Sequence, residues 1–200
     1  MGMRLVVTIK NGDKRLCNIY YHWGAYTYSA LLQTKKIVDC IYNHVDETED
    51  EFLLRLIHFV EQDGGGIAQG KDSREWKYIT KKYPHEKFKE EGIGRNDGLI
   101  CLSNDGMDDS QSWSEGDLEI DLEEYTIHNY VVWSYESIDD YNENWNPDEF
   151  RTKTLDEIID VGYDITCIDI DDIDKVIKAL DEVYDDVCRC GNEIYDLITG

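Results

Sequence analysis

The chain has 200 residues, with 20 Lys and Arg against 44 Asp and Glu, which gives a formal net charge of -24 at pH 7. Its hydrophobic content of 41% and aromatic content of 12% are enough for a packed core, and they argue against an intrinsically disordered protein. The acidic balance disfavours direct binding to nucleic acid or to an anionic membrane. We expect no membrane span, since no apolar run reaches 18 residues, and no signal peptide at the polar start of the sequence.

The first half of the chain predicts a β-hairpin followed by helices. The dipeptide Asn11-Gly12 is a strong hairpin turn signal between two runs rich in β-branched and aromatic residues. A capping box of Thr48 and Glu51 predicts the start of a helix. The expected elements are strands over 3–10 and 14–21, helices over 27–43 and 49–61, and a surface helix or helix-loop over 73–91.

The second half predicts strands and a C-terminal helix. Hydrophobic residues recur from Ile173 to Val187 with helical spacing, which predicts an amphipathic helix at the C-terminal end. Asn104-Asp105-Gly106 is typical of a polar loop. The expected order is a buried strand over 98–103, a loop over 104–109, antiparallel strands over 117–123 and 125–134, a short helix and loop over 136–150, a second capping box at Thr154 and Glu157, and a strand over 163–170.

These elements predict an α+β fold with a mainly antiparallel sheet and about four helices, including the amphipathic C-terminal helix. We expect a single domain over 1–200. A possible seam lies near 92–98, where glycines separate the hairpin and helices of 1–95 from the acidic sheet and helices of 96–200.

The charge is concentrated in one stretch. Residues 96–150 contain 16 Asp and Glu and no Lys or Arg, which is two thirds of the net charge. Like charges held close together on a compact fold repel each other, so a stretch of this kind favours a function for the acidic surface. Residues 1–45 carry a net charge of +4 and are interpreted as a scaffold or as a second contact face.

The strand over 117–123 alternates acidic and apolar residues. Its acidic side chains repeat every roughly 6.7 Å, about twice the axial spacing of phosphates along one DNA strand. One interpretation is an anionic ladder that imitates nucleic acid and enters a Lys/Arg groove. The other is the solvated face of a half-buried strand.

Acidic side chains and two aromatic residues around this strand complete the candidate partner-binding set. Carboxylates together with aromatic rings suit the capture of Arg and Lys side chains. The candidate residues are Asp108, Asp109, Glu115, Asp117, Glu119, Asp121, Glu123, Glu124, Asp139, Asp140, Tyr141, Glu143, Trp145, Asp148 and Glu149.

In size, acidity and aromatic content the chain resembles the small acidic inhibitors that phages and mobile elements make against host nucleases, of the anti-CRISPR or anti-restriction type. The resemblance rests on general character and includes no diagnostic motif. It implies a non-enzymatic inhibitor that blocks a basic groove of a nuclease, such as a CRISPR nuclease. It also implies a cytoplasmic location, in the host cytoplasm if the protein is phage-encoded, and the six scattered cysteines fit a reducing compartment.

Two other functions stay open. The first is an antitoxin or immunity-type protein that binds one basic protein. The second is a divalent-metal-dependent hydrolase, since the acidic runs 104–109 and 169–174 offer oxygen ligands, although neither has the spacing of an EF-hand loop. His22 and Cys17 could form a catalytic pair, but His22 is better explained as a member of an aromatic cluster. We therefore predict no catalytic residues, no metal and no cofactor.

Overall fold

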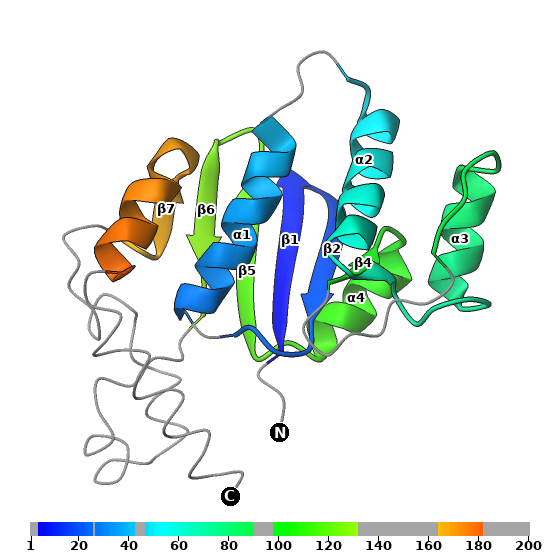
Figure 1. Ribbon diagram of the computed structural model, residues 1–200, viewed down its shortest axis with the longest axis horizontal. Helices are drawn as coiled ribbons and strands as arrows, with labels where there is room; N and C mark the ends of the chain where they lie inside the picture. The colour runs from blue at the N-terminus through cyan, green and yellow to red at the C-terminus, as the bar shows by residue number, and fades with distance from the viewer. Residues whose placement is uncertain (1–3, 26, 43–46, 90–97, 132–163, 182–200) are drawn as a thin grey trace, which may run out of the picture.

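The computed structural model describes residues 4–25, 27–42, 47–89, 98–131 and 164–181. Seven strands form one sheet in the order β3-β4-β2-β1-β5-β6-β7 (Figure 1). The strands are β1 Leu5–Asn11, β2 Lys14–Tyr21, β3 Gly66–Ile67, β4 Leu99–Cys101, β5 Gly116–Asp121, β6 Thr126–Asn129 and β7 Cys167–Asp169. The helices are α1 Thr27–Tyr42, α2 Glu49–Gln62, α3 Arg74–Lys82, α4 Asn104–Ser112, the short 3-10 helix η1 Ile170–Asp172 and an α-helix over residues 173–181.

The N-terminal hairpin is confirmed. β1 and β2 pair antiparallel, with Asn11 opposite Lys14, so Gly12 and Asp13 form the turn. Gly12 has φ +58°, in the left-handed region that glycine adopts without strain. The capping box at the start of α2 is also confirmed: the Thr48 hydroxyl accepts from the Glu51 amide at 3.3 Å, and the Glu51 carboxylate accepts from the Thr48 amide at 2.8 Å.

One face of the sheet is apolar and packs against α1 and α2 (Figure 1). Alternate residues of the central strands point to this face and are fully buried, such as Val7 in β1, Ile19 in β2 and Leu118 in β5. They join one hydrophobic cluster with Leu31 of α1 and Leu56 of α2. This burial is the main source of stability for the described part of the chain.

The opposite face carries polar residues, and α4 packs there. Asn18 of β2 is fully buried, and its amide nitrogen donates to the Met107 carbonyl at 3.1 Å and to the Ser110 hydroxyl at 3.0 Å. Its amide oxygen accepts from the Thr8 hydroxyl at 3.0 Å. The buried asparagine therefore fixes α4 on the sheet through hydrogen bonds that water cannot replace.

The prediction of a loop over 104–109 is wrong, because these residues form the first turns of α4. The Ser103 hydroxyl accepts from the Gly106 amide at 3.0 Å and caps the helix. The carboxylate of Glu75, a buried residue of α3, accepts from the Leu102 amide at 2.6 Å and the Ser103 amide at 3.0 Å. The Ser103 cap and the hydrogen bonds from Asn18 stabilise the helix more than Asn104-Asp105-Gly106 favours a turn.

The prediction of a mainly antiparallel sheet with about four helices is also wrong. The fold is α+β, but the sheet is mixed, and the described residues include five α-helices. β1 pairs in parallel with β5, and β3 in parallel with β4. Local sequence patterns indicate neighbours along the chain, whereas β1 and β5 are more than 100 residues apart in the sequence, so their pairing depends on tertiary packing.

The antiparallel pairing of the strands predicted over 117–123 and 125–134 is confirmed as β5 and β6. The amphipathic C-terminal helix is confirmed over 173–181, where Ile173, Val176 and Leu180 are buried. Strands from both sides of the possible seam at 92–98 share the sheet. The predictions for 136–150 and for the capping box at Thr154 lie outside the described residues.

The buried asparagine gives a test of this packing. We expect Asn18→Ala to lower the free energy of unfolding by about 2–4 kcal/mol, since it leaves buried polar groups of Thr8 and α4 without partners. Asn104→Ala, a change of the same residue type at an exposed position of α4, should stay within about 0.5 kcal/mol. Urea unfolding measures both, and a loss below 1 kcal/mol for Asn18→Ala would contradict the docking described here.

Candidate functional site

Much of the acidic stretch faces basic side chains that come from other parts of the chain. Nine Asp and Glu lie between residues 98 and 131, and five of them form ion pairs with Lys or Arg in the structure. The pairs are Arg4–Glu115 at 3.1 Å, Lys10–Glu119 and Lys10–Asp121 at 3.3 Å each, Arg15–Asp108 at 2.5 Å and Arg74–Asp105 at 2.7 Å. Three of the four basic side chains, Arg4, Lys10 and Arg15, thus come from the N-terminal hairpin and the residue just before it, and they neutralise part of the acidic stretch.

The predicted ladder exists only in part. Asp117, Glu119 and Asp121 alternate with the fully buried Leu118 and Ile120, so they share the polar face of β5. Glu123 comes after the strand ends and lies in the turn between β5 and β6. The parallel register sets Lys10 opposite Asp121, and its ammonium group contacts two of the three acidic side chains. A lysine of the neighbouring strand β1 therefore lies against the row, which differs in this way from a line of phosphates.

Asp121 has a structural role. Its side chain is only 2% exposed, and its Oδ1 accepts from the amides of Gly12 at 3.2 Å, Glu123 at 2.9 Å and Glu124 at 3.2 Å. Burial acts to raise its pKa, but these hydrogen bonds and Lys10 together hold the pKa below its ordinary value. Asp121 therefore ties the β1–β2 turn to the β5–β6 turn.

Asp117 is also held internally. Its Oδ1 accepts from the side chains of Gln111 and Ser114, both at 2.6 Å. Burial raises its pKa, although the two hydrogen bonds oppose the shift. This carboxylate fixes the connection between α4 and β5.

Several exposed acidic groups lie together at one end of the sheet. The β1–β2 turn, the β5–β6 turn and the start of η1 meet there, because the Gly12 amide donates to Asp121 and the Ile170 amide donates to the Tyr125 carbonyl at 3.1 Å. We call this surface the acidic end. It consists of Asp13, Glu123, Glu124, Asp169, Asp171 and Asp172. Within the described part of the chain, Asp13, Glu123 and Asp171 form no ion pair, whereas Glu124 lies 3.7 Å from His128 and Asp172 contacts Lys175.

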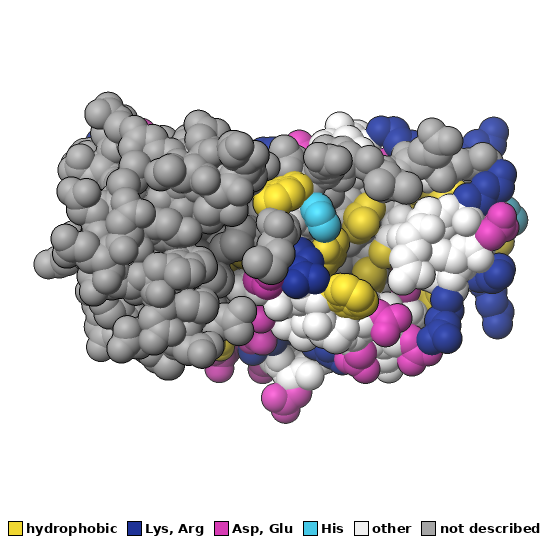
Figure 2. Space-filling view, turned by 90° about the horizontal axis from the view of Figure 1, so that it is seen from below, with side chains coloured by type: hydrophobic (Ala, Val, Ile, Leu, Met, Phe, Trp, Pro, Cys, Tyr) yellow, Lys and Arg dark blue, Asp and Glu magenta, His cyan; other side chains and the backbone are white. Residues whose placement is uncertain are grey.

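An aromatic and basic cluster lies at the opposite end, where β2 ends and β5 begins. The Arg4 guanidinium lies 5.7 Å from the centre of the Trp113 ring and also pairs with Glu115. The Tyr20 hydroxyl lies 3.2 Å from His22 Nδ1, and the His22 ring meets Trp23 edge-on at 5.5 Å. Figure 2 looks onto this end and shows hydrophobic side chains around a histidine, with basic and acidic side chains next to them.

Of the remaining predicted residues, the structure describes the two on α4. Asp108 and Asp109 are exposed on α4, Asp108 in its pair with Arg15. The candidate residues between 139 and 149 lie outside the described residues: Asp139, Asp140, Tyr141, Glu143, Trp145, Asp148 and Glu149. Sequence reasoning missed the basic partners Arg4, Lys10 and Arg15, which only the sheet register brings to the acidic stretch.

Reactive groups are scarce in the part of the chain that the structure describes. Burial raises the pKa of Cys17, and raises that of Cys101 to about 12, so both thiols stay protonated at neutral pH. Over these same ranges no three His, Cys, Asp or Glu side chains are grouped closely enough to hold a metal ion. Cys17 and His22 form no hydrogen bond there, since the partner of His22 is Tyr20.

None of the helices among the described residues is long and apolar enough to cross a membrane. Comparison of the chain with protein-family models, curated proteins and solved structures gives no match.

The pKa of Asp121 yields a pH-dependent prediction. Its ionised form stabilises the fold fully above the ordinary value of 3.8, and this contribution is lost as the pH falls through the lower folded-state pKa. Asp121→Asn keeps an acceptor oxygen but removes the charge. We expect it to cost about 1–2 kcal/mol from pH 7 to about pH 5, with the difference from wild type shrinking toward pH 2.

Urea unfolding over a series of pH values measures this difference. Glu123→Gln serves as the control, since Glu123 is exposed and has no ion pair among the described residues, and should change the unfolding free energy by less than about 0.5 kcal/mol. A cost for Asp121→Asn that stays constant down to pH 2 would rule out an ionised Asp121 as the stabilising group.

Proposed function

We propose that this protein is a non-enzymatic inhibitor that binds the basic, nucleic-acid-binding groove of a nuclease and blocks it. The observation that carries the proposal is the acidic end, where carboxylates of two turns and of the β7–η1 segment lie at one end of the folded sheet. These groups remain exposed after the internal ion pairs have neutralised much of the acidic stretch. An anionic surface fixed in this way complements a surface rich in Lys and Arg.

The mechanism is steric and electrostatic occlusion. Opposite charge accelerates the encounter with the basic partner, and the folded sheet then fills the space that nucleic acid would occupy. The β5 row contributes less than the turns do, since Lys10 neutralises Glu119 and Asp121. The proposal places the protein in the cytoplasm of the cell that holds the nuclease, which is the host cytoplasm if the protein is phage-encoded.

A second candidate is an antitoxin or immunity-type protein that binds one basic protein. The observation that favours it is Lys10 of β1 beside the β5 row, which interrupts the uniform negative charge that imitation of a nucleic-acid backbone requires. The two candidates share the acidic end as the contact surface and differ in the partner.

The test is capture of the partner from the native cytosol, followed by titration of the purified pair. We expect affinity to fall by at least tenfold as NaCl rises from about 0.05 to 0.5 M, because the screening length shrinks roughly threefold. The double variant Glu123→Gln/Glu124→Gln should weaken binding roughly threefold to tenfold. Glu119→Gln, which changes a carboxylate already paired with Lys10, should change it less than about twofold.

Competition with a DNA duplex distinguishes the candidates. A captured nuclease that is released by the duplex supports groove occlusion, and a basic partner that the duplex leaves bound supports the immunity-type candidate. Affinity that is indifferent to salt and to the Glu123/Glu124 changes would refute both.

A further inference from the structure

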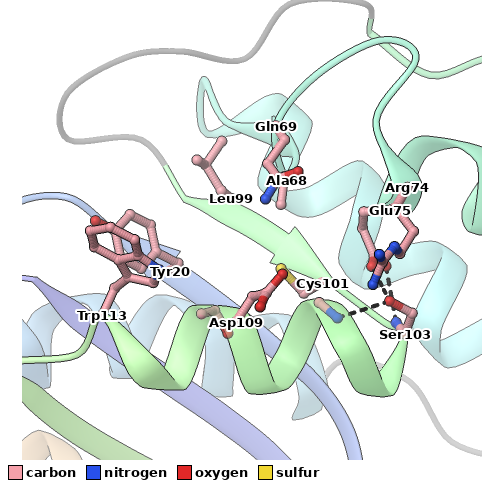
Figure 3. A pocket seen from close by; sticks show the side chains of 12 residues that line it. Tyr20, Ala68, Gln69, Arg74, Glu75, Leu99, Cys101, Ser103, Asp109 and Trp113 are labelled. Carbon is pink, nitrogen blue, oxygen red and sulfur yellow. Dashed lines mark hydrogen bonds between the residues drawn. The ribbon is translucent and has the colours of Figure 1, made fainter.

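A groove of about 600 Å³ runs between α4, β4 and the loop that follows β3 (Figure 3). Tyr20 and Trp113 stand at one end, and Leu99 and Cys101 contribute an apolar part of the lining. Asp109 projects from α4 beside the Cys101 thiol. The volume lies in the range of ligand-binding pockets, and it exceeds what a single side chain needs.

Two of the three charged side chains that line this groove already have partners within the fold. The Glu75 carboxylate accepts hydrogen bonds from the Leu102 amide, the Ser103 amide and the Ser103 hydroxyl, so it is used within the fold. Arg74 pairs with Asp105 at 2.7 Å. Asp109 is exposed and forms no ion pair within the described ranges. The groove therefore presents one available carboxylate to an incoming group.

Asp109 and Trp113 lie four residues apart, one turn along α4, so they face the same side of the helix. Trp113 remains 61% exposed even though the Arg4 guanidinium lies over its ring. An available carboxylate next to an exposed indole matches the two preferences of a guanidinium group: paired hydrogen bonds to a carboxylate and stacking on an aromatic ring.

The chain already binds its own arginines in this manner. Arg4 contacts the Trp113 ring and pairs with Glu115 at 3.1 Å. Arg55 lies 5.5 Å from the centre of the Phe52 ring and pairs with Glu47. A lysine ammonium lacks the planar shape needed for such a double contact. A phosphate-bearing ligand is disfavoured by the net charge of -24.

We propose that this groove receives an arginine side chain of the basic partner, with the guanidinium held by the Asp109 carboxylate and the rings of Trp113 and Tyr20. This inference rests on the proposed function, since it assumes a basic protein partner, and it adds a residue-specific contact to the general attraction of the acidic end. The groove then selects arginine over lysine, which charge alone does not.

Two fluorescently labelled nonapeptides test the proposal, one alternating Gly with four Arg and one alternating Gly with four Lys. We expect the arginine peptide to bind the full-length protein at least tenfold more tightly than the lysine peptide. Trp113→Ala and Asp109→Asn should each reduce this preference to less than threefold by weakening the arginine peptide alone. Fluorescence anisotropy at low salt measures all affinities.

Matched controls separate the groove from general effects. Tyr78→Ala removes another exposed ring, on α3, and Asp108→Asn removes the neighbouring charge on α4, which faces Arg15. Both should keep the preference for arginine. Thermal unfolding checks each variant, and Asp109→Asn, at an exposed position, decides the matter if Trp113→Ala does not fold.

Equal affinity of the wild type for the two peptides would overturn the arginine site and leave the proposed function standing. A preference that persists in both Trp113→Ala and Asp109→Asn would overturn it as well. Binding of neither peptide would overturn the arginine site and count against the proposed function too.

Discussion

The parallel pairing of β1 with β5 brings Lys10 between Glu119 and Asp121, and the rest of the structure depends on this contact. Without it, Glu119 and Asp121 would lie on the same face of β5 with no basic side chain between them, in a fold whose net charge is -24. The same pairing sets the β1–β2 turn against the β5–β6 turn, where Asp121 accepts the amide of Gly12. Charge neutralisation and chain topology are therefore linked at one point of the sheet.

This link divides the acidic side chains into two groups. Those that meet Arg4, Lys10 or Arg15 connect α4, β5 and the loop between them to the N-terminal hairpin, and the pair of Arg74 connects α4 to α3. Those of the acidic end lie in two turns, at the end of β7 and in η1, and have few basic neighbours in the described residues. An exposed charge contributes little to stability, so the second group is available for recognition, as is Asp109 in the groove beside α4. The proposed inhibitor function depends on this second group.

The sequence predicted the structure correctly where residues close together in the chain determine it. Asn11-Gly12 predicts the hairpin, Thr48 and Glu51 predict the start of α2, and the alternation around Leu118 predicts which side of β5 is buried. The sequence did not predict the structure where residues far apart in the chain determine it. α4 forms because Ser103 caps it and Asn18 anchors it, although Asn104-Asp105-Gly106 on its own favours a turn.

The candidate site shows the same difference between local patterns, which were predicted, and long-range contacts, which were not. The sequence correctly places Asp117, Glu119 and Asp121 on one face, but the lysine that neutralises Glu119 and Asp121 lies over 100 residues away in the chain. A count of charge along the sequence treats the hairpin and the acidic stretch as separate surfaces. In the folded chain they meet, and the groove beside Asp109 likewise joins residues from β2, β4 and α4.

A double-mutant cycle between Lys10 and Asp121 tests this account most directly. The single variants Lys10→Gln and Asp121→Asn and the double variant are compared with wild type by urea unfolding at pH 7 and low salt. We predict a coupling free energy of about 1–3 kcal/mol, which becomes smaller in about 0.5 M NaCl. A coupling below about 0.3 kcal/mol would show that the hairpin does not neutralise the acidic strand.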